Sequence, residues 1–213
     1  MTFSFVFLIQ KHVYARITTM SESLERKALK KMLEVRWHGR GGQGAWTASE
    51  LLARAAIYEG KYIQSFPEFG PERMGAPVTA FTRISTEPIH VHCAVYNPDI
   101  VAVLDNTLLK TVPVEEGLSE NGKIIVNSKG KPTEIKTAKV NQSEIWIVPA
   151  TEIAMKYLGM PITNTAMLGA TAKVSSIVRL ESIEKVVKER FRPDLAEKNI
   201  TVIREAYKEA KLS

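Results

Sequence analysis

Apolar and polar positions near the start of the chain first alternate and then recur every three or four residues. The alternating stretch 33–39 predicts a short β-strand that ends at a run of glycines. Residues 43–59 have a helical pattern, and Gly60 is a natural C-terminal stop. The face that this helix would bury consists of Ala48, Leu51, Leu52, Ala55 and Ala56. Residues 61–66 have the pattern of a second strand, so this part of the chain predicts a βαβ unit with a right-handed crossover.

The next stretch, residues 66–77, contains three prolines and two glycines and therefore predicts a loop. A loop of this length inside a compact domain is usually functional or part of an interface. Residues 78–85 and 88–95 both alternate and predict an antiparallel hairpin. Residues 99–105 form a nearly continuous apolar run, which is typical of a strand that helices cover on both faces.

The rest of the chain continues with two strands and then four helices. The strands are predicted at 123–128 and 144–150. The helices are predicted at 151–159 with Thr151 as N-cap and Gly159 as stop, at 164–178 with many small residues, around Ile183, Val186, Val187 and Phe191, and from Pro193 to near the end.

This order of elements predicts the class of the fold. We expect an α/β protein with a Rossmann-like, mostly parallel sheet flanked by helices and with a β-hairpin insertion. We expect one domain at residues 32–213. Residues 1–31 would form an N-terminal extension to it.

The net charge of +6 raises the question of a nucleic-acid partner. Six basic and two acidic side chains lie within residues 1–31, so the extension carries +4 and the other 182 residues only +2. No stripe of basic and aromatic residues accompanies this charge. The apolar run at 3–9 is too short to span a bilayer. We therefore expect neither a nucleic-acid partner nor a membrane.

The chain contains a single cysteine, Cys93. An iron–sulfur cluster normally takes four cysteine ligands, so any cluster chemistry must lie in another chain. A lone cysteine also favours a reducing, cytoplasmic location. We predict Cys93 to be a small core residue of the strand 88–95. His90 and His92 share one side of that strand without a third ligand, so we predict a structural role for them and no metal site.

The turn between the first strand and the first helix carries the clearest chemical signal. The sequence HGRGGQG (38–44) matches G-x-G-x-x-G. Free N–H groups and the helix dipole attract an anion at such a turn, and glycines let phosphate oxygens approach the backbone. The candidate phosphate-contacting residues are Gly39, Arg40, Gly41, Gly42, Gln43 and Gly44. The alternative is a tight turn that needs its glycines for packing alone.

The identity of the anion depends on the second strand and the loop after it. Dinucleotide folds carry an acidic residue at the end of the second strand, where it holds the ribose hydroxyls. Here Glu68 lies beyond a proline, which disfavours NAD. Glu72 and Arg73 in the loop either place charges at a site or form a surface ion pair of small value.

Four further polar residues occupy positions where the ligand crevices of α/β sheets open. Asp105 and Asn106 follow a predicted strand, and Asn164 and Thr165 begin a predicted helix. A capping role would explain each of them equally well.

Several of these stretches together resemble one known family. They are HGRGGQG (38–44), FPEFGPERMGAPVTAFTRIS (66–85), PI (88–89), NPD (97–99) and NTAMLGA (164–170). Five motifs in register are more specific than one glycine motif. They resemble the gamma subunit of 2-oxoacid:ferredoxin oxidoreductases, the pyruvate or 2-oxoisovalerate enzymes, over about residues 33–210. The chain departs from the family at Met74, where many members have two glycines directly after the arginine.

The resemblance implies a subunit of an enzyme that decarboxylates a 2-oxoacid, passes electrons to ferredoxin and forms an acyl-CoA. It implies alpha, beta and delta subunits as partners, with thiamine diphosphate, Mg²⁺ and the 4Fe-4S clusters on those subunits. No cofactor or catalytic residue is then expected on this chain, and the isolated chain should be inactive. Its expected contribution is assembly and part of the coenzyme A site, whose phosphates would suit the glycine-rich turn.

Two other functions stay open on the sequence. The first is a stand-alone nucleotide-dependent oxidoreductase, which would bind NAD(P)H or a flavin tightly as an isolated chain. The second is a purely structural subunit, in which variants of the glycines would disturb assembly and never the affinity for the coenzyme.

Overall fold

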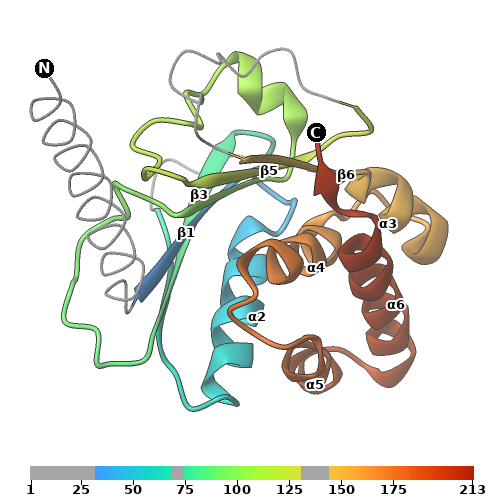
Figure 1. Ribbon diagram of the computed structural model, residues 1–213. Helices are drawn as coiled ribbons and strands as arrows, with labels where there is room; N and C mark the ends of the chain where they lie inside the picture. The colour runs from blue at the N-terminus through green and yellow to red at the C-terminus, as the bar shows by residue number, and fades with distance from the viewer. Residues whose placement is uncertain (1–31, 69–73, 131–143) are drawn as a thin grey trace, which may run out of the picture. The chain divides into compact units, whose positions relative to one another are not determined.

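The computed structural model describes residues 32–68, 74–130 and 144–213. These residues form one sheet of order β2-β3-β1-β4-β5-β6-β7 (Figure 1). The strands are β1 (Met32–Arg40), β2 (Tyr62–Pro67), β3 (Pro77–Ser85), β4 (Ile100–Val103), β5 (Lys123–Asn127), β6 (Glu144–Val148) and β7 (Lys211–Leu212). The helices are α2 (Ala45–Ile57), the 3-10 helix η1 (Asn106–Lys110), α3 (Ala150–Leu158), α4 (Asn164–Ser175), α5 (Leu180–Arg190) and α6 (Pro193–Glu209).

Most strands of the described sheet point the same way. β1, β4, β5 and β6 pair in parallel, and β3 runs antiparallel to both β1 and β2, so β2 shares the direction of β1. β7 pairs antiparallel with β6 at the far edge. The predicted class, an α/β fold with a mostly parallel sheet, is confirmed.

The hairpin insertion consists of other strands than predicted. β3 pairs with β2 from Tyr62↔Ser85 to Pro67↔Ala80, and its other edge pairs with β1. Residues 88–95 form no strand, so the predicted hairpin of 78–85 with 88–95 is wrong. Both edges of β3 are already occupied, which leaves no edge for 88–95 to join. β3 also lies between β1 and β2, so these two strands are not neighbours as they would be in a simple βαβ unit.

The irregular stretch after β3 changes the place of the cysteine. Cys93 is exposed, so its prediction as a core residue is wrong. Its Sγ lies 4.0 Å from Nη2 of Arg83, a buried side chain that pairs with Glu34. His90 and His92 are exposed as well. Among the described residues no three His, Cys, Asp or Glu side chains gather as a metal site.

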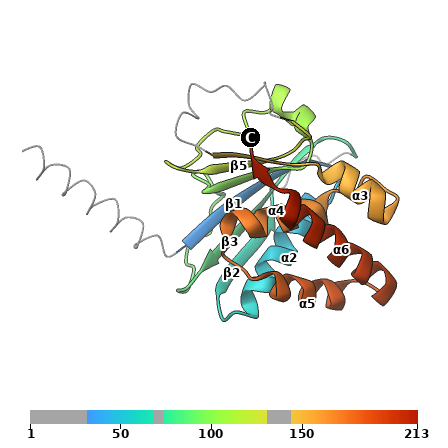
Figure 2. The same ribbon diagram turned by 45° about the vertical axis from the view of Figure 1, so that its right-hand side comes forward.

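The helices α2 to α6 lie on one face of the sheet (Figure 1 and Figure 2). The other face has a smaller apolar cluster, in which Val101 and Val103 of β4 pack with Leu108 of η1 and with Val114. β4 is buried on both faces as its apolar run predicts, but helices α2 to α6 cover only one of them. A short 3-10 helix and the chain after it suffice on the other face because the cluster there is small.

Two predicted helix ends are confirmed and one predicted start is wrong. Gly60 follows α2 and Gly159 follows α3, each with a φ of 72°, the left-handed conformation that favours glycine. α3 begins at Ala150 with Pro149 in the capping position, so Thr151 is not its N-cap. The side chain of Thr151 is instead bonded to Asn127.

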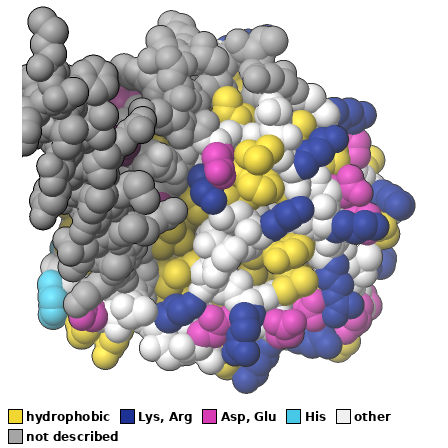
Figure 3. All heavy atoms as spheres, viewed as in Figure 1, with side chains coloured by type: hydrophobic (Ala, Val, Ile, Leu, Met, Phe, Trp, Pro, Cys, Tyr) yellow, Lys and Arg dark blue, Asp and Glu magenta, His cyan; other side chains and the backbone are white. Residues whose placement is uncertain are grey.

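The molecular surface over the last helices carries charges of both signs. Figure 3 shows Lys and Arg side chains interspersed with Asp and Glu side chains at the lower right, where α5 and α6 lie in Figure 1. Two exposed ion pairs join these helices, Lys188–Glu197 and Arg204–Glu184. In the described parts of the chain, no helix combines the length and the apolar character needed to cross a membrane.

Candidate functional site

A cavity of about 800 Å³ opens at the carboxyl ends of the central strands. Its lining comes from residues 41–43, 74, 104–106, 127–130, 151–152 and 161–163. These residues follow β1, β4 and β5, begin α3 and precede α4. In the sheet, β3 and β2 lie on one side of β1, and β4 lies on its other side. The cavity therefore sits at the switch point of the sheet, where α/β proteins bind ligands.

The glycine turn borders this cavity, and its glycines serve two different purposes. Gly44 has a φ of 79°, and a Cβ on it would stand 2.5 Å from Nδ2 of Asn164. Gly44 is therefore needed for its conformation and for the close approach of α4. Gly42 has a φ of 93°, but a Cβ there would meet nothing within 4 Å. The packing explanation thus holds for Gly44, while Gly42 leaves open space beside the cavity.

Most amides of the turn are already engaged. Gly41 N donates to the carbonyl oxygen of Ala76 (2.9 Å), and Gln43 N to that of Arg40 (2.9 Å). Arg40 N donates to Oε1 of Gln43 (2.8 Å). The N–H groups of Gly42 and Gly44 donate to no acceptor among the described residues. Gly42, which lines the cavity, is therefore the turn amide best placed for an anion.

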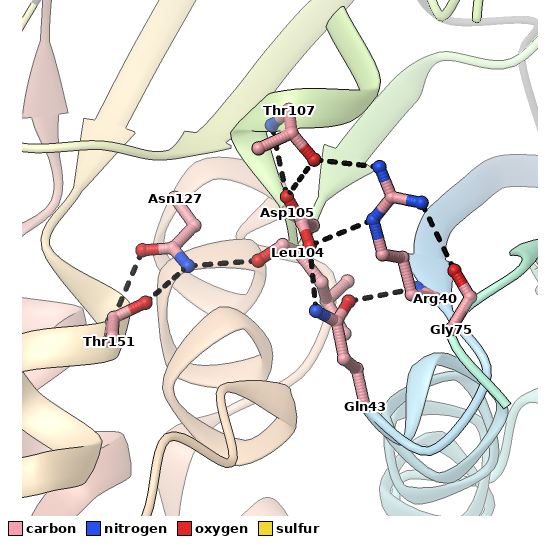
Figure 4. Close-up of polar contacts among 8 residues, drawn as sticks. All are labelled: Arg40, Gln43, Gly75, Leu104, Asp105, Thr107, Asn127 and Thr151. Atoms are coloured by element: carbon pink, nitrogen blue, oxygen red, sulfur yellow. Dashed lines mark hydrogen bonds and ion pairs between the residues drawn. The ribbon is translucent and has the colours of Figure 1, made fainter. Parts of the chain in front are cut away.

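The Arg40 guanidinium turns toward neighbouring protein groups (Figure 4). Its Nε lies 3.2 Å from Oδ2 of Asp105, its Nη1 donates to the carbonyl oxygen of Gly75 (3.0 Å), and its Nη2 donates to Oγ1 of Thr107 (2.8 Å). Nε2 of Gln43 donates to the same carboxylate oxygen at 2.8 Å. The charge of Arg40 is thus paired with Asp105, and each of its three guanidinium nitrogens donates to a protein acceptor. Gln43 holds the turn in place.

Asp105 is saturated by the same network. Its Oδ1 accepts from N and Oγ1 of Thr107, at 3.0 and 2.6 Å, so Asp105 caps η1. Burial alone would raise the pKa of Asp105, but the bonds from Thr107 and Gln43 and the charge of Arg40 together lower it. An ionised carboxylate with every oxygen occupied serves neither as a base nor as a metal ligand. The capping role is the one that the structure supports for Asp105.

Asn127 joins three elements beside the cavity (Figure 4). Its Nδ2 donates to the carbonyl oxygen of Leu104 (2.8 Å) and to Oγ1 of Thr151 (2.8 Å), and its Oδ1 accepts from N of Thr151 (3.1 Å). This ties the ends of β4 and β5 to the first turn of α3. At the rim, Nζ of Lys129 lies 3.0 Å from Oε1 of Glu152. None of these four polar residues is among the site residues predicted from the sequence, although Asn127 ends an apolar strand and Lys129 comes two residues later.

Several other predicted site residues do not line the cavity. Asn164 and Thr165 are buried in the first turn of α4, where Oγ1 of Thr165 bonds Oδ1 of Asn199 at 2.8 Å. They lie behind Gly44 and are not among the residues that line the cavity. Gly39, like Arg40, also does not line it. Glu72 and Arg73 fall outside the described residues.

His38, just before the turn, is also unavailable for chemistry. Burial, and then the charge of Arg36, lower the pKa of His38 to about 3. Its Nε2 accepts from Nε of Arg36 at 3.1 Å. This histidine is therefore a neutral structural acceptor.

The fold and the cavity together define a class: an α/β protein with a ligand crevice at its switch point and no unpaired titratable side chain among the described residues that line it. Comparison with known proteins takes the identification further. The family profile for pyruvate ferredoxin/flavodoxin oxidoreductase matches residues 34–209. The chain therefore belongs to this family.

Its relatives are subunits of the gamma type. The common gamma subunit of the pyruvate/ketoisovalerate oxidoreductases of Pyrococcus furiosus is 52% identical over 182 residues, which cover 85% of this chain and 98% of that one. Pyruvate synthase subunit PorC of Methanothermobacter marburgensis is 49% identical over 182 residues, 85% and 99% of the two chains. The crystal structure of pyruvate oxidoreductase subunit PORC of Thermotoga maritima matches with a TM-score of 0.76 and 45% identity, covering 86% and 99%. The resemblance to the gamma subunit of 2-oxoacid:ferredoxin oxidoreductases is confirmed.

Proposed function

We propose that the chain works as the gamma subunit of an assembled 2-oxoacid:ferredoxin oxidoreductase with alpha, beta and delta subunits. The enzyme would decarboxylate pyruvate or a related 2-oxoacid, form the acyl-CoA and pass the electrons to ferredoxin. Near-complete coverage of gamma-type relatives supports this role. An affinity-tagged chain purified from its native cells should bring the other subunits with it. Recovery of the chain alone would contradict the assembly role.

The reaction chemistry would take place on the sister subunits, which would hold thiamine diphosphate, Mg²⁺ and the 4Fe-4S clusters. The titratable groups among the described cavity-lining residues are Asp105, Lys129 and Glu152. Asp105 is saturated by hydrogen bonds, and the other two pair with each other. None is a free acid, base or nucleophile. The isolated chain should therefore not turn over a 2-oxoacid.

The cavity is the part of this chain that would hold the phosphate-bearing end of coenzyme A. Its volume of about 800 Å³ suits an organic ligand. The single observation that carries the proposal is the position of the cavity, since Gly42, whose amide donates to no acceptor among the described residues, lines it at the switch point of the sheet. Part of the coenzyme would extend to the other subunits.

A pair of substitutions at Gly42 tests this site in the assembled enzyme. Gly42→Asp places a carboxylate beside the cavity, whereas Gly42→Ala imposes a positive-φ backbone cost at least as large without adding charge. We expect Gly42→Asp to raise the KM for coenzyme A by about tenfold or more over Gly42→Ala, since like charges repel strongly in a crevice. The KM for the 2-oxoacid should stay unchanged. Equal KM values for coenzyme A in the two variants would remove the site from this cavity.

The geometry argues against a stand-alone NAD-dependent enzyme. In dinucleotide folds the second strand lies beside the first, so that its terminal acid reaches the ribose. Here β3 separates β2 from β1, and Glu68 is exposed beyond the end of β2. Titration of the isolated chain with NADH or a flavin should show no tight binding.

A further inference from the structure

We propose that Lys129 is the cation with which this chain contacts a phosphate of the ligand, and that Glu152 holds its ammonium group in the unliganded protein. The inference rests on the proposed coenzyme site and assigns the charged contact within it. From the sequence, Arg40 is the cationic residue among the six candidate phosphate contacts of the glycine turn.

Arg40 and Lys129 are two cationic side chains near the cavity, and they differ in how firmly they are bound. Arg40 donates to Asp105, Gly75 and Thr107, and a ligand would have to break this network to reach its guanidinium. Lys129 is the one cationic side chain among the described residues that line the cavity. Arg40 is therefore a positioning residue that fixes the glycine turn, and Lys129 is the charge that a ligand can reach.

The ammonium group of Lys129 is held by a single exposed ion pair among the described residues. Its Nζ lies 3.0 Å from Oε1 of Glu152, and the two side chains are 73% and 45% exposed. An exposed ion pair of this kind contributes little to stability. Glu152 also lies in the first turn of α3, whose dipole stabilises a carboxylate without help from the lysine. Lys129 can therefore leave Glu152 for a ligand phosphate at small cost.

Two hydrogen-bond donors, the amide of Gly42 and the ammonium group of Lys129, border the cavity from different elements. Gly42 borders it from the turn between β1 and α2, and Lys129 borders it from the end of β5. A ligand with separated phosphate groups, such as the diphosphate and the ribose phosphate of coenzyme A, would meet an amide on one side and an ammonium on the other. The ammonium group of lysine, a point charge on a flexible side chain, suits this second contact because it does not require a fixed geometry.

Two substitutions in the same ion pair give opposite results if this assignment holds. In the assembled enzyme, Lys129→Gln should raise the KM for coenzyme A on the order of three- to tenfold, the range of one exposed charged contact. It should also flatten the dependence of that KM on salt concentration, because one phosphate contact is lost. Glu152→Gln should lower the KM, since it frees Lys129 and removes a negative charge. Lys188→Gln, in the exposed pair with Glu197 on α5 and α6, is the matched control and should leave the KM unchanged.

A purely structural ion pair would behave differently, because losing either partner would shift the KM in the same direction. That result would overturn the assignment, as would an unchanged KM in Lys129→Gln together with a raised one in Gly42→Asp. An unchanged KM in both variants would instead reject the coenzyme site itself. The thermal midpoints of Lys129→Gln and Glu152→Gln, measured in parallel, should equal that of the wild type, because an exposed ion pair contributes little to stability.

Discussion

The carboxylate of Glu59 connects the end of one helix to the start of another. Its Oε1 accepts from Arg179 N and Ser182 Oγ, both at 2.8 Å, and its Oε2 lies 3.0 Å from Nζ of Lys61. No side chain of α5 caps its own first turn, so Glu59 after α2 supplies the acceptor. Burial alone would raise the pKa of Glu59, but the bonds from Arg179, Lys61 and Ser182 and the lysine charge lower it to about 2.

The stability that Glu59 supplies should therefore depend on pH. A carboxyl group with a depressed folded-state pKa stabilises the protein above its unfolded pKa of about 4.5, and this contribution is lost as pH falls toward 2. We expect Glu59→Gln to lower the free energy of unfolding by about 1 to 2 kcal/mol at pH 7, because the amide keeps an acceptor but loses the charge. The difference from wild type should shrink between pH 4.5 and pH 3 in urea titrations. A difference that is equal at pH 7 and pH 3 would show that the charge is irrelevant.

Arg40 and Lys129 show how much of the site the sequence could predict. The G-x-G-x-x-G pattern located the turn correctly, because strand, glycines and helix are local features. The role of Arg40 depends on Asp105 and Thr107, which are 65 and 67 positions away in the chain. Lys129 approaches the cavity only because β5 pairs beside β4. These contacts follow from strand order, which the local pattern does not specify.

At the scale of elements, β3 shows the same limit. Its alternating residues predicted a strand, and the strand exists at Pro77–Ser85. The pattern of 88–95 was equally good locally, yet β3 pairs with β2 and β1 instead. The neighbours of a strand depend on the apolar surface that the whole sheet buries. In its observed position β3 contributes Ala80 and Ile84 to the main apolar core. Alternation identifies a strand but leaves its neighbours open.

The contact between α4 and α6 depends on a single small residue. A Cβ on Gly169 of α4 would stand 2.3 Å from the carbonyl oxygen of Ile203 in α6. Backbone cannot yield as a flexible side chain can, so the two helices would have to move apart. Gly169 is one of the small residues of the predicted helix 164–178, and it permits that close approach.

Gly169→Ala should therefore destabilise the protein even though alanine favours helices. We expect a loss of about 1 to 3 kcal/mol in the free energy of unfolding, the usual cost of overpacking. Gly130→Ala is the matched control, because a Cβ at Gly130 meets nothing within 4 Å and its φ is not positive. That variant should stay within about 0.5 kcal/mol of wild type in the same denaturant titration. Equal stability of the two variants would mean that α4 and α6 pack with room to spare.

At the scale of the described molecule, the sequence predicted the class of the fold and the kind and approximate position of most elements. The sequence predicted helices in the regions of α2 to α6. α3, α5 and α6 each bury one apolar stripe, whereas α4 is buried on nearly all sides and consists largely of small residues. The sequence did not predict that these helices share one face of the sheet. The segment between β4 and β5 contains η1 in place of a crossover α-helix. η1 and Val114 cover the second face of the sheet there, so the longer helices α2 to α6 all lie on the first face. The carboxyl ends of the strands stay open beside η1, and the cavity lies there.

The boundary of the folded domain gives the last prediction. β1 begins at Met32, which pairs with Ser85, and the family match begins at residue 34. The main apolar core is built from residues 35–210. We therefore expect a chain that starts at Met32 to fold and to join the other subunits as the full chain does. Its thermal midpoint should lie within about 3 °C of the full chain, which corresponds to roughly 1 kcal/mol for a protein of this size.

A second truncation serves as the control. A chain that starts at Trp37 loses the first half of β1, including the fully buried Val35 and the pairing of Glu34 with Arg83. It should unfold at a much lower temperature or fail to accumulate, since it exposes β3 and β4 along the lost pairs. Co-purification with the sister subunits then distinguishes a role of residues 1–31 in assembly from a role in folding. If the chain from Met32 is as stable as the full chain but does not assemble, residues 1–31 are a docking arm and not a dispensable extension.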